Sequence, residues 1–239
     1  MLNPPAPVGH VWDGVTEVLF VDTAHYQDKM VLADWVDLFK RGFRAMYPKA
    51  VDGANGPDSY WAKSKALAKE AGLLCFAGYC FFRFDQDPIA QAQALVKVTG
   101  GVKSGELPCV IDCEWDNASK DLGYHDSDHG GTRQMIDAAG EEKLYACLRQ
   151  VEILTGVTPW LYGSTGFLSF KSPARFARFP FIVAAYSAKV SDATVRLPAP
   201  WKQETARQYS GSLTTANGGG IDGDRFLGTL EQLKAYVKP

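Results

Sequence analysis

The stretch of residues 73–114 has the sequence LLCFAGYCFFRFDQDPIAQAQALVKVTGGVKSGELPCVIDCE. Its two ends, 73–82 and 107–114, are short apolar runs typical of buried β-strands. The middle, 88–99, predicts a helix and places its proline in the first turn, where the missing N–H costs no hydrogen bond. A strand, a helix and a second strand without a hairpin turn predict a parallel βαβ unit.

The same alternation continues on both sides of this unit. Residues 18–22 and 43–47 are predicted strands, and 30–41 and 58–71 are predicted helices. Further along, we expect a helix over 131–155 and strands over 159–162, 181–185 and 205–209. A chain of 239 residues suits one barrel of this kind, which needs roughly 200 to 250 residues. We therefore predict an α/β fold: a single TIM-like barrel with parallel strands and a less regular C-terminal half.

The domain organisation is expected to be simple. Residues 1–16 contain Pro and Gly and predict an irregular lead-in, and 17–239 predict one barrel domain. The sequence contains no internal repeat, no low-complexity tract and no linker that would join a second module.

Composition excludes several classes of protein. Lys plus Arg is 25 and Asp plus Glu is 27, so the net charge is −2, and such a balanced chain has no general attraction to nucleic acid or anionic membranes. No apolar run approaches the ~20 residues of a membrane-spanning helix, and the N-terminus lacks the pattern of a secretory signal. The five cysteines are an odd number without CxxC spacing, which favours reduced thiols, and thus a reducing cytoplasm, over disulfides or a zinc site.

Two acids end the strand at 107–114. Asp112 and Glu114 are two residues apart, so an extended strand projects them from the same face. Active sites of parallel barrels lie at this end of the strands, and like charges held close raise one pKa, which favours Glu114 as a general acid. Taken alone, the spacing also fits acids that only bind loop N–H groups or arginines.

Two further acids strengthen the catalytic interpretation. Asp22 closes the first predicted strand, and Asp222 lies near the last one. The first and last strands of a closed barrel are neighbours, so we expect Asp22 and Asp222 to face Asp112 and Glu114 across the mouth. Four carboxylates in one cleft suit hydrolysis of a glycosidic bond.

The chain resembles glycoside hydrolase family 25, the Chalaropsis-type lysozymes of bacteria, fungi and phage endolysins. The similarity runs from about Val18 to the C-terminus in the family's order. The segments that resemble the family's motifs are VDTAHYQ (21–27), RAMYPKAVDG (44–53), AGL (71–73) with GYCFF (78–82) and QA (91–92), PCVIDCE (108–114), PWLYGS (159–164), VAAY (183–186) and RQYS (207–210) with IDGDRF (221–226). The sequence departs from those motifs at Tyr26, Asp52, Cys80, Arg207 and Asp224.

The resemblance implies a lysozyme (N-acetylmuramidase) that cleaves the β-1,4 bond between N-acetylmuramic acid and N-acetylglucosamine in peptidoglycan. Glu114 matches the proton donor, Asp112 its partner carboxylate, and Asp22 and Asp222 the remaining cleft acids. Retention of configuration is implied, by either a covalent glycosyl-enzyme or a substrate-assisted route. No metal or organic cofactor is expected.

Several other residues are candidates for binding the sugar chain, because amphipathic aromatic rings stack on sugars while their polar tips hydrogen-bond. They are Tyr79, Tyr162, Tyr186 and Tyr209, together with Lys49 and Gln208 from the matched motifs. Each tyrosine fits barrel packing equally well. We expect peptidoglycan glycan strands as the partner, no nucleic acid, no membrane insertion and a monomer.

Alternatives differ from this interpretation in testable ways. A chitinase-like barrel of the DxxDxDxE type requires an acid where Val110 stands, a glucosaminidase would cut the other bond, and a non-catalytic glycan-binding barrel would have lost its acids. The segment DLGYHDSDHGG (121–131) carries two histidines among acids but predicts a polar loop rather than a metal site.

With no wall-binding module or signal apparent, we expect a phage endolysin that is held in the host cytoplasm until lysis. A bacterial enzyme exported by another route is the alternative.

Overall fold

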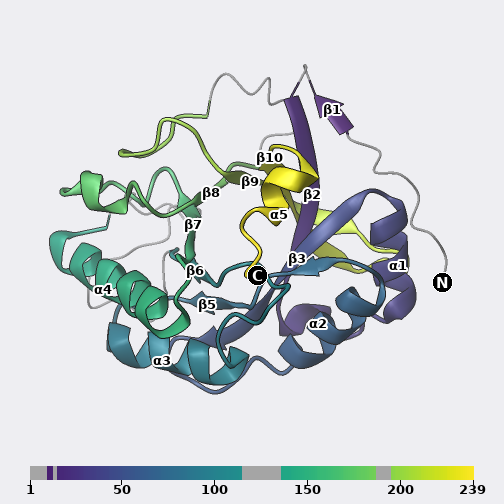
Figure 1. The fold of residues 1–239 in the computed structure, drawn as a ribbon, viewed down its shortest axis with the longest axis horizontal. Helices are drawn as coiled ribbons and strands as arrows, with labels where there is room; N and C mark the ends of the chain where they lie inside the picture. Colours follow the sequence, from purple (N-terminus) through teal and green to yellow (C-terminus); the bar gives the residue numbers. More distant parts are fainter. Residues whose placement is uncertain (1–9, 13–14, 115–135, 187–194) are drawn as a thin grey trace.

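A computed structural model describes residues 10–12, 15–114, 136–186 and 195–239. Its strands form one sheet in the order β1-β2-β10-β9-β8-β7-β6-β5-β3-β4, and β2 also pairs with β3. That additional pairing closes the strands from β2 to β10 into a ring, with β1 and β4 outside it (Figure 1). The strands are β1 (His10–Trp12), β2 (Val15–Thr23), β3 (Phe43–Asp52), β4 (Leu74–Cys75), β5 (Tyr79–Phe81), β6 (Val110–Asp112), β7 (Trp160–Ser164), β8 (Phe181–Ala184), β9 (Ala206–Thr214) and β10 (Gly220–Leu227).

Helices cover the outside of the ring, mostly in the N-terminal half. The helices are α1 (Leu32–Lys40), α2 (Trp61–Glu70), α3 (Pro88–Thr99), α4 (Ala138–Thr155) and α5 (Leu230–Lys234), with 3₁₀ turns η1 (His25–Gln27) and η4 (Pro173–Phe176). Between β7 and β8 the chain forms only the η4 turn. The predicted α/β barrel with a less regular C-terminal half is thus confirmed. Within the described ranges, none of the helices combines the length and the apolar character that a membrane span requires.

The last strand departs from the all-parallel prediction. β2, β3, β5, β6, β7, β8 and β9 pair in parallel around the ring, whereas β10 runs antiparallel to both β9 and β2. Residues 215–219 connect β9 to β10 through a tight turn in which Gly218 has a φ of +80°. Such a short connection is a hairpin, because a parallel return needs a crossover of a dozen or more residues.

β3 is longer than predicted. The sequence predicted a strand over 43–47, which ends before Pro48, and proline is rarely found inside a sheet. In the structure β3 continues through Pro48 to Asp52. Pro48 lies opposite Thr23, the last residue of β2, and beyond it β3 pairs with β5, starting at Lys49 and Tyr79. The proline therefore lies where pairing with β2 ends, just before pairing with β5 begins.

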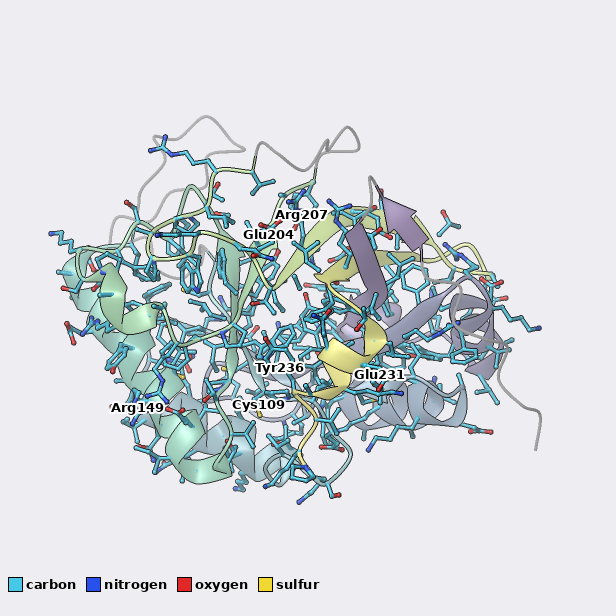
Figure 2. All side chains as sticks on the ribbon, turned by 45° about the horizontal axis from the view of Figure 1, so that its top comes forward. Cys109, Arg149, Glu204, Arg207, Glu231 and Tyr236 are labelled. Atoms are coloured by element: carbon cyan, nitrogen blue, oxygen red, sulfur yellow. The ribbon has the colours of Figure 1, made fainter. Side chains whose placement is uncertain are left out.

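The barrel interior is packed with aromatic rings below a polar layer. Phe20, Tyr47, Phe76 and Trp160 are buried there, with Phe76 and Trp160 in edge-to-face contact at 5.1 Å between centroids. At the end where β2 and β6 begin, α5 packs against this cluster through Leu233. Tyr236, which Figure 2 labels beside α5, contacts Trp160. One end of the barrel is therefore closed by helix α5, and the opposite end is left for a site.

Candidate active site

A cavity of about 260 Å³ opens at the carboxyl ends of the parallel strands. Asp112 and Glu114 both line it. Asp112 is the last residue of β6 and is 7% exposed, whereas Glu114 is half-buried just beyond the strand. Because Val110, two residues earlier, belongs to the interior cluster, strand alternation also directs Asp112 inward.

Asp22 and Asp222 line the same cavity. They are directly opposite each other in the antiparallel pairing of β2 with β10. The reversed direction of β10 places its first residues at the carboxyl end of the parallel strands, which brings Asp222 to the mouth. The structure therefore brings together all four acids that the sequence singled out.

Crowding of these acids changes their ionisation. Burial, and then repulsion from Glu114, raises the pKa of Asp112 well above its usual range, and burial also raises the pKa of Glu114. Repulsion between the two neighbouring carboxyls favours a proton on one of them. Burial and repulsion from Asp222 raise the pKa of Asp22 to about 8. The cleft therefore retains protons at a pH where exposed carboxyls have lost theirs.

Gln208 connects Asp22 to two tyrosines across the cavity. Its Nε2 donates to Asp22 Oδ2 at 2.6 Å, and its Oε1 accepts from Tyr162 at 2.7 Å and also from Tyr186. The Tyr162 and Tyr186 hydroxyls are 3.2 Å apart. The amide thus has one orientation, and it fixes the positions of Asp22 and of both phenol tips.

The opposite wall carries the cations of the cavity. Lys49 and Arg83 both contact Asp52, with Lys49 Nζ and Arg83 Nη2 each 2.9 Å from Asp52 Oδ2. Both cations also lie over the ring of Phe81, at 4.8 Å for Lys49 and 4.7 Å for Arg83. Lys49, Arg83 and Asp52 together carry a net positive charge, opposite to that of the acids on the neighbouring strands β2 and β6.

Five of the six predicted substrate-binding residues line the cavity: Tyr79, Tyr162, Tyr186, Gln208 and Lys49. Tyr209 does not. It follows Gln208 in β9, so its side chain leaves the opposite face of the strand, where it is half-buried next to Gly223. Tyr209 therefore lies away from the four acids.

Sequence reasoning missed Tyr47, Asp52 and Arg83 as cavity residues. Asp52 ends β3 just as Asp22 lies near the end of β2, so an acid at a strand end was a usable signal once β3 was known to pass Pro48. Tyr47 and Arg83 carried no comparable signal.

Residues 121–131, predicted to be a polar loop, lie outside the described residues. Within the described ranges, no group of three or more His, Cys, Asp or Glu side chains is arranged to hold a metal ion.

With the barrel and its acidic mouth established, the chain can be compared with known proteins. The model of glycosyl hydrolases family 25 matches residues 21–217, most of the chain. The chain belongs to glycosyl hydrolases family 25. It is therefore a glycoside hydrolase, as the carboxylates predicted. The family match ends before β10, so Asp222 and Asp224 lie beyond it.

Known proteins similar to this family 25 hydrolase match most of its length. A muramidase from Trichobolus zukalii is 26% identical, with a TM-score of 0.72 over 92% of this chain and 99% of that one. A family 25 glycosyl hydrolase from Bacillus anthracis is 22% identical, with a TM-score of 0.72 over 96% and 97% of the two chains, and shows the same fold. The uncharacterized protein YegX of Escherichia coli K12 is 25% identical over 224 residues, 91% of this chain and 72% of that protein.

Proposed function

We propose that this family 25 hydrolase is an N-acetylmuramidase that cleaves the β-1,4 bond between N-acetylmuramic acid and N-acetylglucosamine in bacterial peptidoglycan. The observation that carries the proposal is the carboxyl pair at the end of β6, which faces two more acids in one cavity. Membership of family 25 and the similarity to a protein described as a muramidase support the choice of substrate.

Glu114 is the proposed proton donor. The Asp112–Glu114 pair shares a proton because burial raises the pKa of both groups, and Glu114 is the more exposed member. When a sugar chain fills the cavity, the shared proton passes through Glu114 to the glycosidic oxygen as the C–O bond breaks. Asp112 is then left as the anion beside the developing positive charge of the oxocarbenium-like transition state.

Water completes the reaction by attacking the same face of the sugar that the leaving group occupied. Glu114, now ionised, takes a proton from that water and returns to its starting state. Configuration at the anomeric carbon is retained whether Asp112 forms the glycosyl bond itself or orients the acetamido group of the substrate. Asp22 and Asp222 are the proposed remaining cleft carboxylates, placed opposite the pair.

The other cavity residues are proposed to hold the glycan strand. Tyr79, Tyr162 and Tyr186 offer ring faces for sugar packing, and Gln208 and Lys49 offer polar contacts. We further propose that the protein acts on the cell wall as a monomer, in the manner of a phage endolysin.

Replacing Glu114 tests the proposal. Glu114→Gln keeps the shape of the side chain but removes its proton, so turnover of purified peptidoglycan should fall by about 10²–10⁴-fold. The matched control is Glu70→Gln, because Glu70 is exposed on α2, away from the cavity. Turbidity loss of a peptidoglycan suspension measures both rates. Wild-type turnover by Glu114→Gln would remove Glu114 as the proton donor.

A further inference from the structure

Asp224 is a carboxyl group buried beneath the acidic mouth, and no cation among the described residues forms an ion pair with it. It lies two residues after Asp222 on β10, so both leave the same face of the strand. Its side chain is 0% exposed. Its Oδ2 has no hydrogen-bond partner among the described residues, and an ionised carboxylate in such a place would be very costly.

Tyr47 lies between Asp224 and Asp22. The Tyr47 hydroxyl is 3.2 Å from Asp22 Oδ2 and 3.2 Å from Asp224 Oδ1. A phenol has one hydrogen to donate, so it serves only one of these oxygens. The other contact is a hydrogen bond only if that carboxyl carries its own proton and donates it to the phenol oxygen.

The neighbouring carboxyl of Asp22 leads to the same conclusion. Repulsion between Asp22 and Asp224 favours a proton on one of the two. Asp22 Oδ2 already accepts from Gln208 Nε2 at 2.6 Å in addition to Tyr47. Asp22 is thus supplied with donors, and Asp224 is not.

We infer that Asp224 is a neutral carboxylic acid that donates its proton within this triangle, so that Tyr47 and Gln208 direct their own hydrogens at Asp22. Asp224 acts through Asp22 and is therefore a positioning residue, below the atoms that would touch a substrate. This consequence for catalysis rests on the proposed function, whereas the protonation itself does not.

The charged surroundings of Asp224 favour the neutral form. The titratable groups that face Asp224 are Asp22 on β2, Tyr47 on β3 and Asp222 on its own strand. Tyr209 on β9 leaves the opposite face of its strand and interacts with Asp224 only through charge. Burial, followed by repulsion from Asp22 and Asp222, raises the pKa of Asp224 well above its usual range. The neighbouring cations pair elsewhere: Arg207 contacts Glu204 (Figure 2) and Arg225 contacts Glu17.

Two variants separate a neutral acid from an ionised one. In Asp224→Asn the amide donates the same hydrogen bond at every pH, whereas Asp224→Leu fills the space without a donor. In the folded wild type Asp224 keeps its proton, whereas in the unfolded chain Asp224 loses that proton near pH 4. The stability of the wild type therefore falls as pH rises above that point, until pH passes the pKa of Asp224 in the folded state. Asp224→Asn has no such proton to lose, so its stability does not fall for this reason.

Thermal melts from pH 4 to pH 9 measure the effect without any activity assay. We expect the melting temperature of Asp224→Asn, relative to that of wild type, to rise with pH. The ratio of the two folding equilibrium constants should change by up to about tenfold per pH unit. The infrared difference spectrum of wild type minus Asp224→Asn at neutral pH should contain the C=O band of one protonated carboxylic acid, because the protons held by Asp22 and by the Asp112–Glu114 pair are present in both proteins and cancel. A relative stability that stays constant or falls with pH, or the absence of that band, would overturn the inference.

Peptidoglycan turnover then tests the positioning role. Asp224→Asn should keep turnover within a factor of a few of wild type, and Asp224→Leu should lose much more, because Tyr47 loses its donor and Asp22 its fixed hydrogen bonds. If Asp224→Leu does not fold, the pH profile of kcat for Asp224→Asn decides alone, since it should extend to higher pH. Equal turnover by a folded Asp224→Leu, or an unchanged pH profile, contradicts the role. If the muramidase proposal is wrong, wild type itself shows no turnover of peptidoglycan. That result differs from a wild type that turns over peptidoglycan while its Asp224 variants behave alike.

Discussion

Lys49 interacts both with Asp52 beside it and with the carboxyl pair of Asp112 and Glu114. It pairs with Asp52 at 2.9 Å and, at longer range, its charge lowers the pKa of both Asp112 and Glu114, against the larger upward effect of burial. The sequence predicted that Lys49 contacts substrate. The structure adds an electrostatic influence on the carboxyl pair, which no local pattern shows because it depends on β3 lying next to β5 and β5 next to β6.

Replacing Lys49 should therefore move the pH dependence of activity. Loss of the cation disfavours the ionised form of each carboxyl, so both pKa values rise, and the pH–kcat profile of Lys49→Met should shift to higher pH. Turnover of peptidoglycan measured across pH checks this, with the exposed Lys29→Met as the control. A profile that shifts to lower pH, or one identical to that of Lys29→Met, would contradict the electrostatic role.

Among the elements, β7 fixes the position of the segment that carries Glu114 after β6 ends. Regular pairing of β6 stops at Asp112, yet the N–H of Cys113 still donates to the carbonyl of Tyr162 at 2.9 Å. The next residue of β7, Gly163, has no side chain. A Cβ built there would lie 2.7 Å from the Cys113 carbonyl oxygen and 2.6 Å from Leu168 Cδ1. The close approach of the two backbones holds Glu114 toward the cavity.

Gly163→Ala should consequently disturb the site through the backbone. The added methyl group must push the Cys113 carbonyl away, which we expect to cost about 1–3 kcal/mol of stability and to lower kcat by misplacing Glu114. Gly56→Ala is the matched control, because a Cβ at Gly56 meets nothing within 4 Å. Thermal melts and turnover measure the two effects. Wild-type values for Gly163→Ala would mean that β7 does not set the position of Glu114.

The elements were predictable where short apolar runs alternate with helical spacing, as in the unit from β5 to β6. They were not predictable where pairing depends on distant partners. The hairpin of β9 and β10 was missed because residues 216–220 have the sequence ANGGG, which indicates a flexible turn without setting the direction of the strand that follows. The same inversion places Asp222 at the mouth and Asp224 below it.

At the scale of the whole molecule, closure of the barrel assembles the site. Asp22 and Asp222 are 200 residues apart in the chain, and they become neighbours because β10 pairs with β2. The sequence predicted that meeting from the general geometry of closed barrels. It did not predict the buried triangle of Asp22, Tyr47 and Asp224, because which acids are buried and which are solvated is decided only when all strands are in register.

The most direct test of the central claim is mass spectrometry of the fragments that the intact protein releases from purified peptidoglycan. A cleft in which Glu114 protonates the bond after N-acetylmuramic acid must leave that sugar at the reducing end of every new fragment. Reduction with borohydride before analysis marks the reducing sugar. Fragments that end in reduced N-acetylmuramic acid are the predicted result, and fragments that end in reduced N-acetylglucosamine, or no fragments, would contradict the account.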